Sequence, residues 1–166
     1  MDYTNLTIPD KTHDGIYTME TLVHVPDYRQ ALRQFHRVLK LKGKLALFEY
    51  STLPSKDLKN LPPELQSMCQ MVVDESGMHS LPYFTHGSFP QLLEKEGFVN
   101  VKVANITPRV IPMLKKFYRY AYYPYKVIKL LGFQRQFINA TSAIASKDLL
   151  EHKAWRYNII TATKLG

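Results

Sequence analysis

Cysteine is almost absent from this 166-residue sequence, because Cys69 is its only example. A single thiol excludes an internal disulfide and a zinc site built from cysteines, and it favours a reducing, cytoplasmic location. No apolar run approaches the roughly 20 residues that a membrane span requires. The polar start, residues 1–4, lacks the apolar core of a signal peptide, so we expect a protein that is not secreted.

Acidic residues are missing from residues 97–147, where nine lysines and arginines fall. The net charge of +8 comes from this segment, because cations and anions are nearly balanced elsewhere. Aromatic residues are interspersed with the cations between Arg109 and Arg135. Three interpretations stay open: lid helices over a substrate pocket, contact with an anionic membrane surface, or nucleic-acid binding. No nucleic-acid motif accompanies the segment, so we expect no nucleic-acid partner.

Strand and helix patterns alternate in the first third of the chain. Residues 15–19 are a short β-prone run, and Asp27 is placed to cap a helix that Gly43 would end. Residues 44–50 are nearly all apolar, which predicts a strand covered on both faces. Strand, helix and strand joined by short turns form a βαβ unit, so we expect the two strands to be parallel.

Later elements are spaced less regularly. Proline-rich stretches surround one expected helix over residues 63–73. Ser88 is placed to cap another helix, which Gly97 would end. Two further strands are expected over residues 99–104 and 154–163, which brings the total to four.

Two stretches carry a family resemblance: residues 14–27, DGIYTMETLVHVPD, and residues 37–50, RVLKLKGKLALFEY. Their order and spacing resemble the second half of class I S-adenosylmethionine-dependent methyltransferases. Within that superfamily the likeness is greatest to sterol C-24 methyltransferases and tocopherol-methyltransferase-like relatives. The resemblance implies an α/β fold: the C-terminal half of a Rossmann-like methyltransferase sheet, with about four strands, the last one antiparallel, and a helical lid.

The resemblance also implies how the domain is organised. Residues 1–106 and 154–166 would form the half Rossmann-like core, and residues 107–153 a basic, aromatic helical insertion that serves as the lid. The family's strand order would leave the strand at Ile16 as an exposed parallel edge. Because such an edge invites pairing with another chain, we expect a homo- or hetero-oligomer.

The family's glycine-rich cofactor turn is not found in this sequence, because no two of its seven glycines are two residues apart. The turn lets the backbone approach the cofactor closely. Of the family's contacts to S-adenosylmethionine, the resemblance carries over only Asp2, which matches the acidic residue that reaches the adenine amino group. We therefore expect the chain alone not to bind this cofactor in the conventional way.

The resemblance places the acceptor-substrate pocket at the carboxyl ends of the strands. Glu20 and His24 follow the first strand and Glu49 ends the second; as catalytic residues they would act as a base or stabilise a developing cation. Alternatively, Glu20 and His24 fix a loop by hydrogen bonds and Glu49 lies in solvent. No metal site is expected, because the histidines lack metal-ligand spacing. The implied substrate-binding residues are Tyr17, Tyr50 and Tyr83.

Three functions remain open at this point. The first is C-methylation of a sterol or another lipophilic small molecule, with the glycine-rich half supplied from elsewhere. The second is a cofactor-independent isomerisation or cyclisation of a hydrophobic natural product in the retained pocket. The third is a non-catalytic partner that pairs with a full-length relative. A lipophilic substrate also fits a peripheral location on an intracellular membrane.

Overall fold

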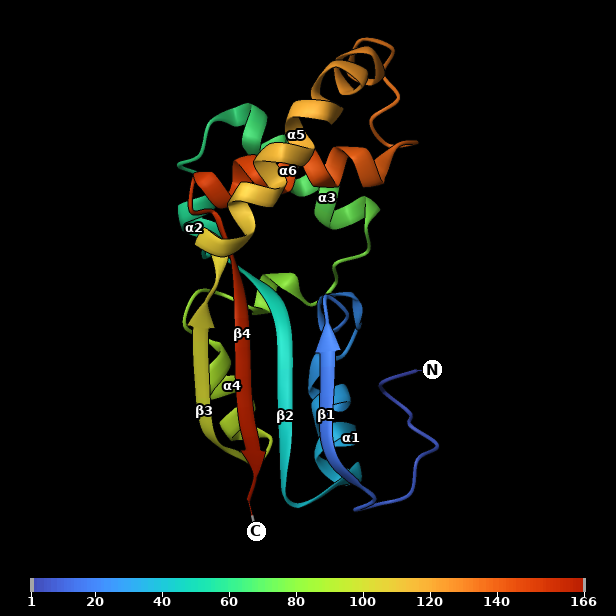
Figure 1. Ribbon diagram of the computed structural model, residues 1–166, viewed down its shortest axis with the longest axis vertical. Helices are drawn as coiled ribbons and strands as arrows, with labels where there is room; N and C mark the ends of the chain where they lie inside the picture. The colour runs from blue at the N-terminus through green and yellow to red at the C-terminus, as the bar shows by residue number, and fades with distance from the viewer. Residues whose placement is uncertain (1, 166) are drawn as a thin grey trace.

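A computed structural model describes residues 2–165. Its sheet has the order β1-β2-β4-β3, with β1 parallel to β2 and β4 antiparallel to both of its neighbours. The predicted α/β class, the four strands and the antiparallel last strand are confirmed. Figure 1 shows the elements, which in chain order are β1 (His13–Met19), η1 (Leu22–His24), α1 (Tyr28–Val38), β2 (Leu39–Thr52), α2 (Ser55–Leu58), α3 (Pro63–Glu75), η2 (Leu81–Tyr83), α4 (Phe89–Lys95), β3 (Phe98–Asn105), α5 (Thr107–Leu130), α6 (Ile138–Glu151) and β4 (Trp155–Lys164).

Helix α1 begins as the sequence predicts. The Asp27 carboxylate accepts hydrogen bonds from the backbone N–H groups of Arg29 and Gln30, both at 3.0 Å, and so satisfies two donors of the first turn. The Gln30 side chain donates to the Thr4 carbonyl instead of returning to Asp27. The helix buries one apolar face against the sheet, formed by Ala31, Leu32, Phe35 and Val38.

The turn after α1 differs from the prediction. The helix ends at Val38 and β2 begins at Leu39, so Gly43 lies inside the strand and does not terminate the helix. The left-handed backbone position is Lys42, with φ of 63°. A Cβ on Gly43 would lie 2.8 Å from the carbonyl oxygen of Lys40, so close approach of the backbone is what requires glycine here.

Among the described residues, helices cover one face of the sheet along its length and the other face only at the carboxyl end of β2, where Trp155 and Tyr157 are buried. Helices α1 and α4 lie on the first of these faces in Figure 1, and the side chains of Leu45 and Leu47 are buried beneath them. On the other face Tyr17 and Met19 are 76% and 55% exposed. The prediction that residues 44–50 are covered on both faces is therefore wrong for the chain as described. We call this second side the open face.

Helices α2, α3, α5 and α6 gather beyond the carboxyl ends of β1, β2 and β3 (Figure 1). Helix α5 packs on α6, and α6 packs on α3 and β4. Helices α5 and α6 lie within residues 107–153, the segment expected to be helical. Among residues 2–165, no helix combines the length and apolar character that crossing a membrane requires.

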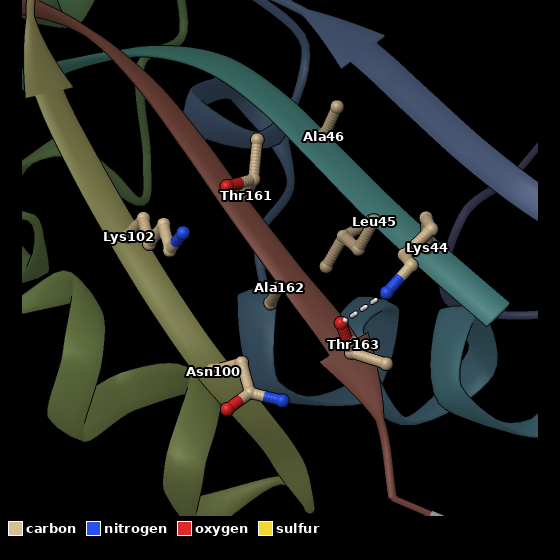
Figure 2. A pocket seen from close by; sticks show the side chains of 8 residues that line it. All are labelled: Lys44, Leu45, Ala46, Asn100, Lys102, Thr161, Ala162 and Thr163. Carbon is tan, nitrogen blue, oxygen red and sulfur yellow. Dashed lines mark hydrogen bonds between the residues drawn. The ribbon is translucent and has the colours of Figure 1, made fainter. Parts of the chain in front are cut away.

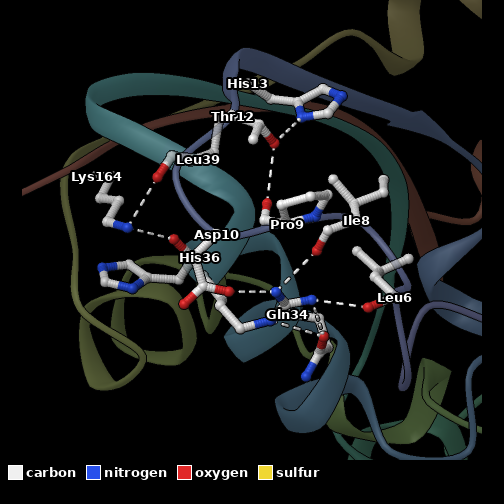
Figure 3. Close-up of polar contacts among 11 residues, drawn as sticks. Leu6, Ile8, Pro9, Asp10, Thr12, His13, Gln34, His36, Leu39 and Lys164 are labelled. Atoms are coloured by element: carbon white, nitrogen blue, oxygen red, sulfur yellow. Dashed lines mark hydrogen bonds and ion pairs between the residues drawn. The ribbon is translucent and has the colours of Figure 1, made fainter.

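Two cationic side chains donate hydrogen bonds to backbone carbonyls near the end of α1 (Figure 3). The Arg37 guanidinium donates to the carbonyls of Leu6 and Ile8 at 2.8 and 2.9 Å. The Lys164 ammonium, at the end of β4, donates to the carbonyl of His36 at 2.7 Å. The N-terminal segment and the last strand are thus both tied to the same end of one helix.

Candidate active site

An aromatic cluster lies at the carboxyl end of β2. Tyr50 and Tyr157 face each other across the β2–β4 register, with ring centroids 4.9 Å apart, and the Trp155 ring lies 5.5 Å from that of Tyr50. Tyr157 and Trp155 are buried, and Tyr50 is partly buried. Because β1 and β2 are parallel, this cluster is at the sheet edge where α/β folds bind ligands.

Glu20 is the charged residue beside this cluster. It follows β1 directly, in a left-handed conformation with φ of 52°, and its N–H donates to the Phe48 carbonyl at 2.8 Å. Burial, followed by the nearby Glu20 carboxylate, raises the pKa of the Tyr157 phenol far above its usual range. The same two causes raise the pKa of Tyr50. Both phenols therefore stay protonated and can donate hydrogen bonds.

Glu49 points away from the cluster, because it alternates with Tyr50 along β2. Its side chain is 0% exposed, and Oε1 accepts from the backbone N–H groups of Thr21 and Leu22 at 3.0 and 2.7 Å. Burial raises the pKa of this carboxyl to about 7, against the lowering effect of the N–H donors. The alternative that placed Glu49 in solvent is wrong: the carboxyl holds the loop after β1.

The other expected site residues are spread over the surface. His24 is exposed, and its Nδ1 lies 3.3 Å from the Gly77 carbonyl oxygen, a contact that fixes the loop. Tyr17 lies on the open face of β1, and Tyr83 packs against the ring of Tyr28 at 5.5 Å. Of the residues named from the sequence, the structure brings Glu20 and Tyr50 together around Tyr157.

Sequence reasoning missed Tyr157 and Trp155. The signal was present, since residues 155, 157, 159 and 161 alternate along β4 and share the open face. That alternation identifies a face only when the pairing of β4 with β2 is known. The pairing joins residues more than 100 positions apart, so the sequence pattern alone did not reveal it.

The described residues do not fit a complete S-adenosylmethionine site. Asp2 is exposed, and its carboxylate accepts from the N–H and the hydroxyl of Thr4 at 2.8 and 2.7 Å. These bonds lower its pKa. No glycine-rich turn accompanies it in the sequence. Within residues 2–165, no three His, Cys, Asp or Glu side chains are grouped so that they could hold a metal ion.

A hollow of 480 Å³ lies on the open face, away from the aromatic cluster. Figure 2 shows it at the amino end of β2, where the Lys44 ammonium donates to the Thr163 hydroxyl at 3.0 Å. Its position, far from the carboxyl ends of the parallel strands, separates it from the candidate site. The residues that line it are Lys44, Leu45, Ala46, Asn100, Lys102, Thr161, Ala162 and Thr163.

Sequence comparisons found similarity to a methyltransferase domain and to a Diels-Alderase. Residues 1–47 match the family described as "Methyltransferase domain". Over 165 residues the chain is 31% identical to the S-adenosyl-L-methionine-dependent Diels-Alderase iccD of Talaromyces variabilis. This match covers 99% of the present chain and 56% of the Diels-Alderase. The chain thus spans about half the length of this relative. Sterol 24-C-methyltransferases match over a shorter stretch, 36% of the chain, so the expected closest likeness to them is not confirmed.

Solved structures share the fold over nearly the whole chain. Phosphoethanolamine N-methyltransferase 2 of Haemonchus contortus, in complex with S-adenosyl-L-methionine, has a TM-score of 0.71 at 16% identity, covering 99% of this chain and 36% of its own. The [4+2]-cyclase SpnF has a TM-score of 0.67 at 18% identity, covering 100% of this chain and 56% of its own. The chain therefore has the Rossmann-like fold of S-adenosylmethionine-dependent methyltransferases.

Proposed function

We propose that the protein acts on a lipophilic small molecule and closes a ring in it by a [4+2] cyclisation. The observation that carries the proposal is the position of Glu49. Its carboxylate is buried and bonded to the loop after β1, so it is not available beside Glu20 as half of an acid–base pair. What faces the site are the rings and protonated phenols of Tyr50 and Tyr157 and the single carboxylate of Glu20, with no second acid–base group, which suits a reaction without proton transfer.

The proposed reaction requires the protein only to bind the substrate in a folded conformation and to polarise one of its double bonds. In a [4+2] cyclisation two carbon–carbon σ bonds form as two π bonds are consumed, and no proton, electron or leaving group is exchanged. Tyr50, which is partly buried, supplies an apolar ring face against which a polyene can fold, and the buried Trp155 ring packs against it. In the proposed reaction the protonated Tyr157 hydroxyl donates to a carbonyl conjugated with the reacting alkene, which draws electron density from the alkene.

The match to the Diels-Alderase supports this reaction. It runs through helices α5 and α6, which we propose form a lid, as well as through the sheet, because it covers 99% of the chain. Lid segments over a pocket are where substrate specificity resides in folds whose cores serve many chemistries. The cofactor named for that relative is S-adenosyl-L-methionine. The described residues do not fit a complete site for it, and the proposed ring closure does not consume it.

Methyl transfer is the second candidate, and the match of residues 1–47 to the methyltransferase domain favours it. Its substrate would be a sterol or another lipophilic molecule methylated at carbon. The exposed carboxylate of Glu20, next to the ring faces of Tyr50 and Tyr157, suits a developing positive charge. In this reaction Glu20 would stabilise the cation, and His24 and Glu49 would hold the loop that carries it.

Either reaction is proposed to need an α/β segment that carries a glycine-rich turn and adds a parallel strand beside β1. Two features support this partner. The unpaired edge of β1 and the exposed side chains of Tyr17 and Met19 form a continuous surface with the open face. The Diels-Alderase also has 44% of its length outside the match. A second copy paired through β1 would cover the edge but not the open face.

The test uses the full chain, alone and co-expressed with the part of the Diels-Alderase that lies outside the match. The probe is a linear polyene with a tethered diene and an alkene conjugated to an amide carbonyl, with S-adenosylmethionine added. Liquid chromatography and mass spectrometry separate the outcomes. Cyclisation changes the retention time at constant mass, and methylation adds the mass of one methylene group. Turnover by neither preparation overturns both candidates.

Tyr157→Phe is the variant that tests the site. We expect a roughly tenfold loss of cyclisation, the cost of one hydrogen bond in the transition state. Tyr3→Phe is the matched control, because Tyr3 packs edge-on against Phe35 beneath the covered face. Equal rates for the two variants would remove Tyr157 from the mechanism.

A further inference from the structure

Helix α5 carries an apolar stripe that no described residue covers. Tyr118 and Tyr125 face α6: the Lys147 ammonium lies 4.5 Å from the Tyr118 ring centroid, and Tyr125 is buried. Another side of the same helix is exposed along its whole length. The side chains on this outer stripe recur at intervals of three, four or seven residues, the spacing of one helix face; they are Met113, Phe117, Tyr120, Val127 and Leu131.

The stripe continues into the turn between α5 and α6, which stands at one end of the molecule (Figure 1). Leu130 is 86% exposed there, and Phe133 and Phe137 are exposed as well. Isolated exposed apolar residues need no explanation, but a contiguous patch marks an interaction site. The outer stripe and this tip are continuous, so one partner can contact both.

Charge identifies the partner. The acidic residues next to the helix pair with cations on its inner side, among them Glu64 with Lys129 and Glu151 with Lys115. Beside the outer stripe the cations are exposed, and no acidic residue exists between Glu96 and Asp148 in the sequence. Four cations of α5 join no ion pair among residues 2–165: Arg109, Lys116, Arg119 and Lys126.

From this arrangement we infer that α5 docks the protein on an anionic membrane surface. An apolar stripe flanked by lysine and arginine, with tyrosines beside it, is the pattern of a helix that lies in the membrane interface. Nucleic acid does not suit the aliphatic centre at Val127 and Leu131. A second copy of the chain is disfavoured as the partner. Pairing two stripes would bring Lys116 and Arg119 of one copy close to the same cations of the other, and these like charges repel. The inference is independent of which reaction the site performs.

The experiment is co-sedimentation of the full chain with vesicles of equimolar phosphatidylcholine and phosphatidylserine. We expect binding that weakens as salt is raised and is much weaker on phosphatidylcholine alone. Val127→Glu/Leu131→Glu should abolish it. The matched control is Leu41→Glu/Val103→Glu, which adds the same charge at exposed positions on β2 and β3; Leu41 and Leu131 are both 58% exposed. Neutralising Lys116 by Lys116→Gln should lower the partition coefficient roughly fivefold.

Several results would overturn the inference. One is wild-type protein that stays in the supernatant with anionic vesicles. Another is an equal loss of binding in the stripe variant and its control, because added negative charge at any exposed position would then explain the loss. A third is concentration-dependent dimerisation that the stripe variant abolishes while vesicle binding is absent, which would assign the stripe to a second copy of the chain. Circular dichroism of each variant confirms that it is folded.

Discussion

The Glu49 carboxylate lies 2.7 Å from the backbone nitrogen of Leu22, and this hydrogen bond joins β2, near its carboxyl end, to the loop that follows β1. The carboxyl is fully buried, and its second oxygen has no hydrogen-bond partner among the described residues. Such a group costs free energy when it is ionised. Its protonation is therefore coupled to folding.

Glu49→Gln should remove a pH dependence of stability. Burial raises the pKa of Glu49 from 4.5 to about 7 in the folded state, so on raising the pH the unfolded state loses this proton first. The contribution of Glu49 to the free energy of unfolding then falls between about pH 4.5 and 7, by about 3 kcal/mol at 1.36 kcal/mol per pKa unit. Urea denaturation at pH 5 and pH 8 measures the change.

The comparison with wild type isolates Glu49 from the histidines. Burial lowers the pKa of both His36 and His86, so these two groups make stability rise with pH and oppose the effect of Glu49. Their contribution is common to both proteins and cancels in the difference. A difference between variant and wild type that is the same at both pH values contradicts the raised pKa.

Arg37→Ala should loosen the N-terminal segment. The guanidinium holds the carbonyls of Leu6 and Ile8 by charge-assisted hydrogen bonds, which are stronger than neutral ones. We expect the free energy of unfolding to fall by about 2 kcal/mol, with faster hydrogen exchange in residues 6–12. Arg33→Ala is the control: Arg33 makes one ion pair, with Glu96, from an exposed position, so a loss as large as that of Arg37→Ala would contradict the assignment.

Lys42→Gly should stabilise the protein. Lys42 has φ of 63°, a conformation that costs a residue with a Cβ roughly 1 kcal/mol and costs glycine almost nothing. The gain is reduced by the larger freedom of glycine in the unfolded chain, so we expect a net rise of about 0.5 kcal/mol. Lys44→Gly, in the extended part of β2, should instead destabilise. Thermal unfolding of the two variants tests the difference in sign.

Cys69 should resist thiol reagents until the protein unfolds. Its side chain is buried on α3, and burial raises the pKa of the thiol to about 11. Relative to an ordinary thiol this lowers the thiolate fraction at pH 8 roughly a hundredfold, before access is considered. Ellman's reagent should label one thiol in urea and none on the same timescale in native buffer. Rapid native labelling would contradict the burial of the Cys69 side chain on α3.

Local signals predicted the local parts of the fold. The cap at Asp27, the βαβ unit and the position of each strand follow from short-range patterns. Gly43 shows where such signals are ambiguous: a glycine after a helix suits a left-handed turn, yet here it allows the backbone to pass close to Lys40. Both structural roles require glycine, and only the three-dimensional course of the backbone shows which of them applies.

The candidate site was predicted in part, because its residues come from distant segments. Glu20 and Tyr50 end neighbouring parallel strands, so their nearness follows from the βαβ unit. Tyr157 joins them only through the pairing of β4 with β2. The direction in which Glu49 points depends on which face of the sheet α1 covers. The sequence of β2 has apolar residues on both of its faces, so it does not indicate which face that is.

Strand β4 lies between β2 and β3 although it is the last of the four to be made. A ribosome releasing this chain exposes β3 some fifty residues before its only neighbour in the described sheet exists. During that interval β3 is an unpaired strand that a chaperone, or another nascent chain, can contact. The rate at which residues 107–154 are translated therefore sets how long the half-built sheet is exposed.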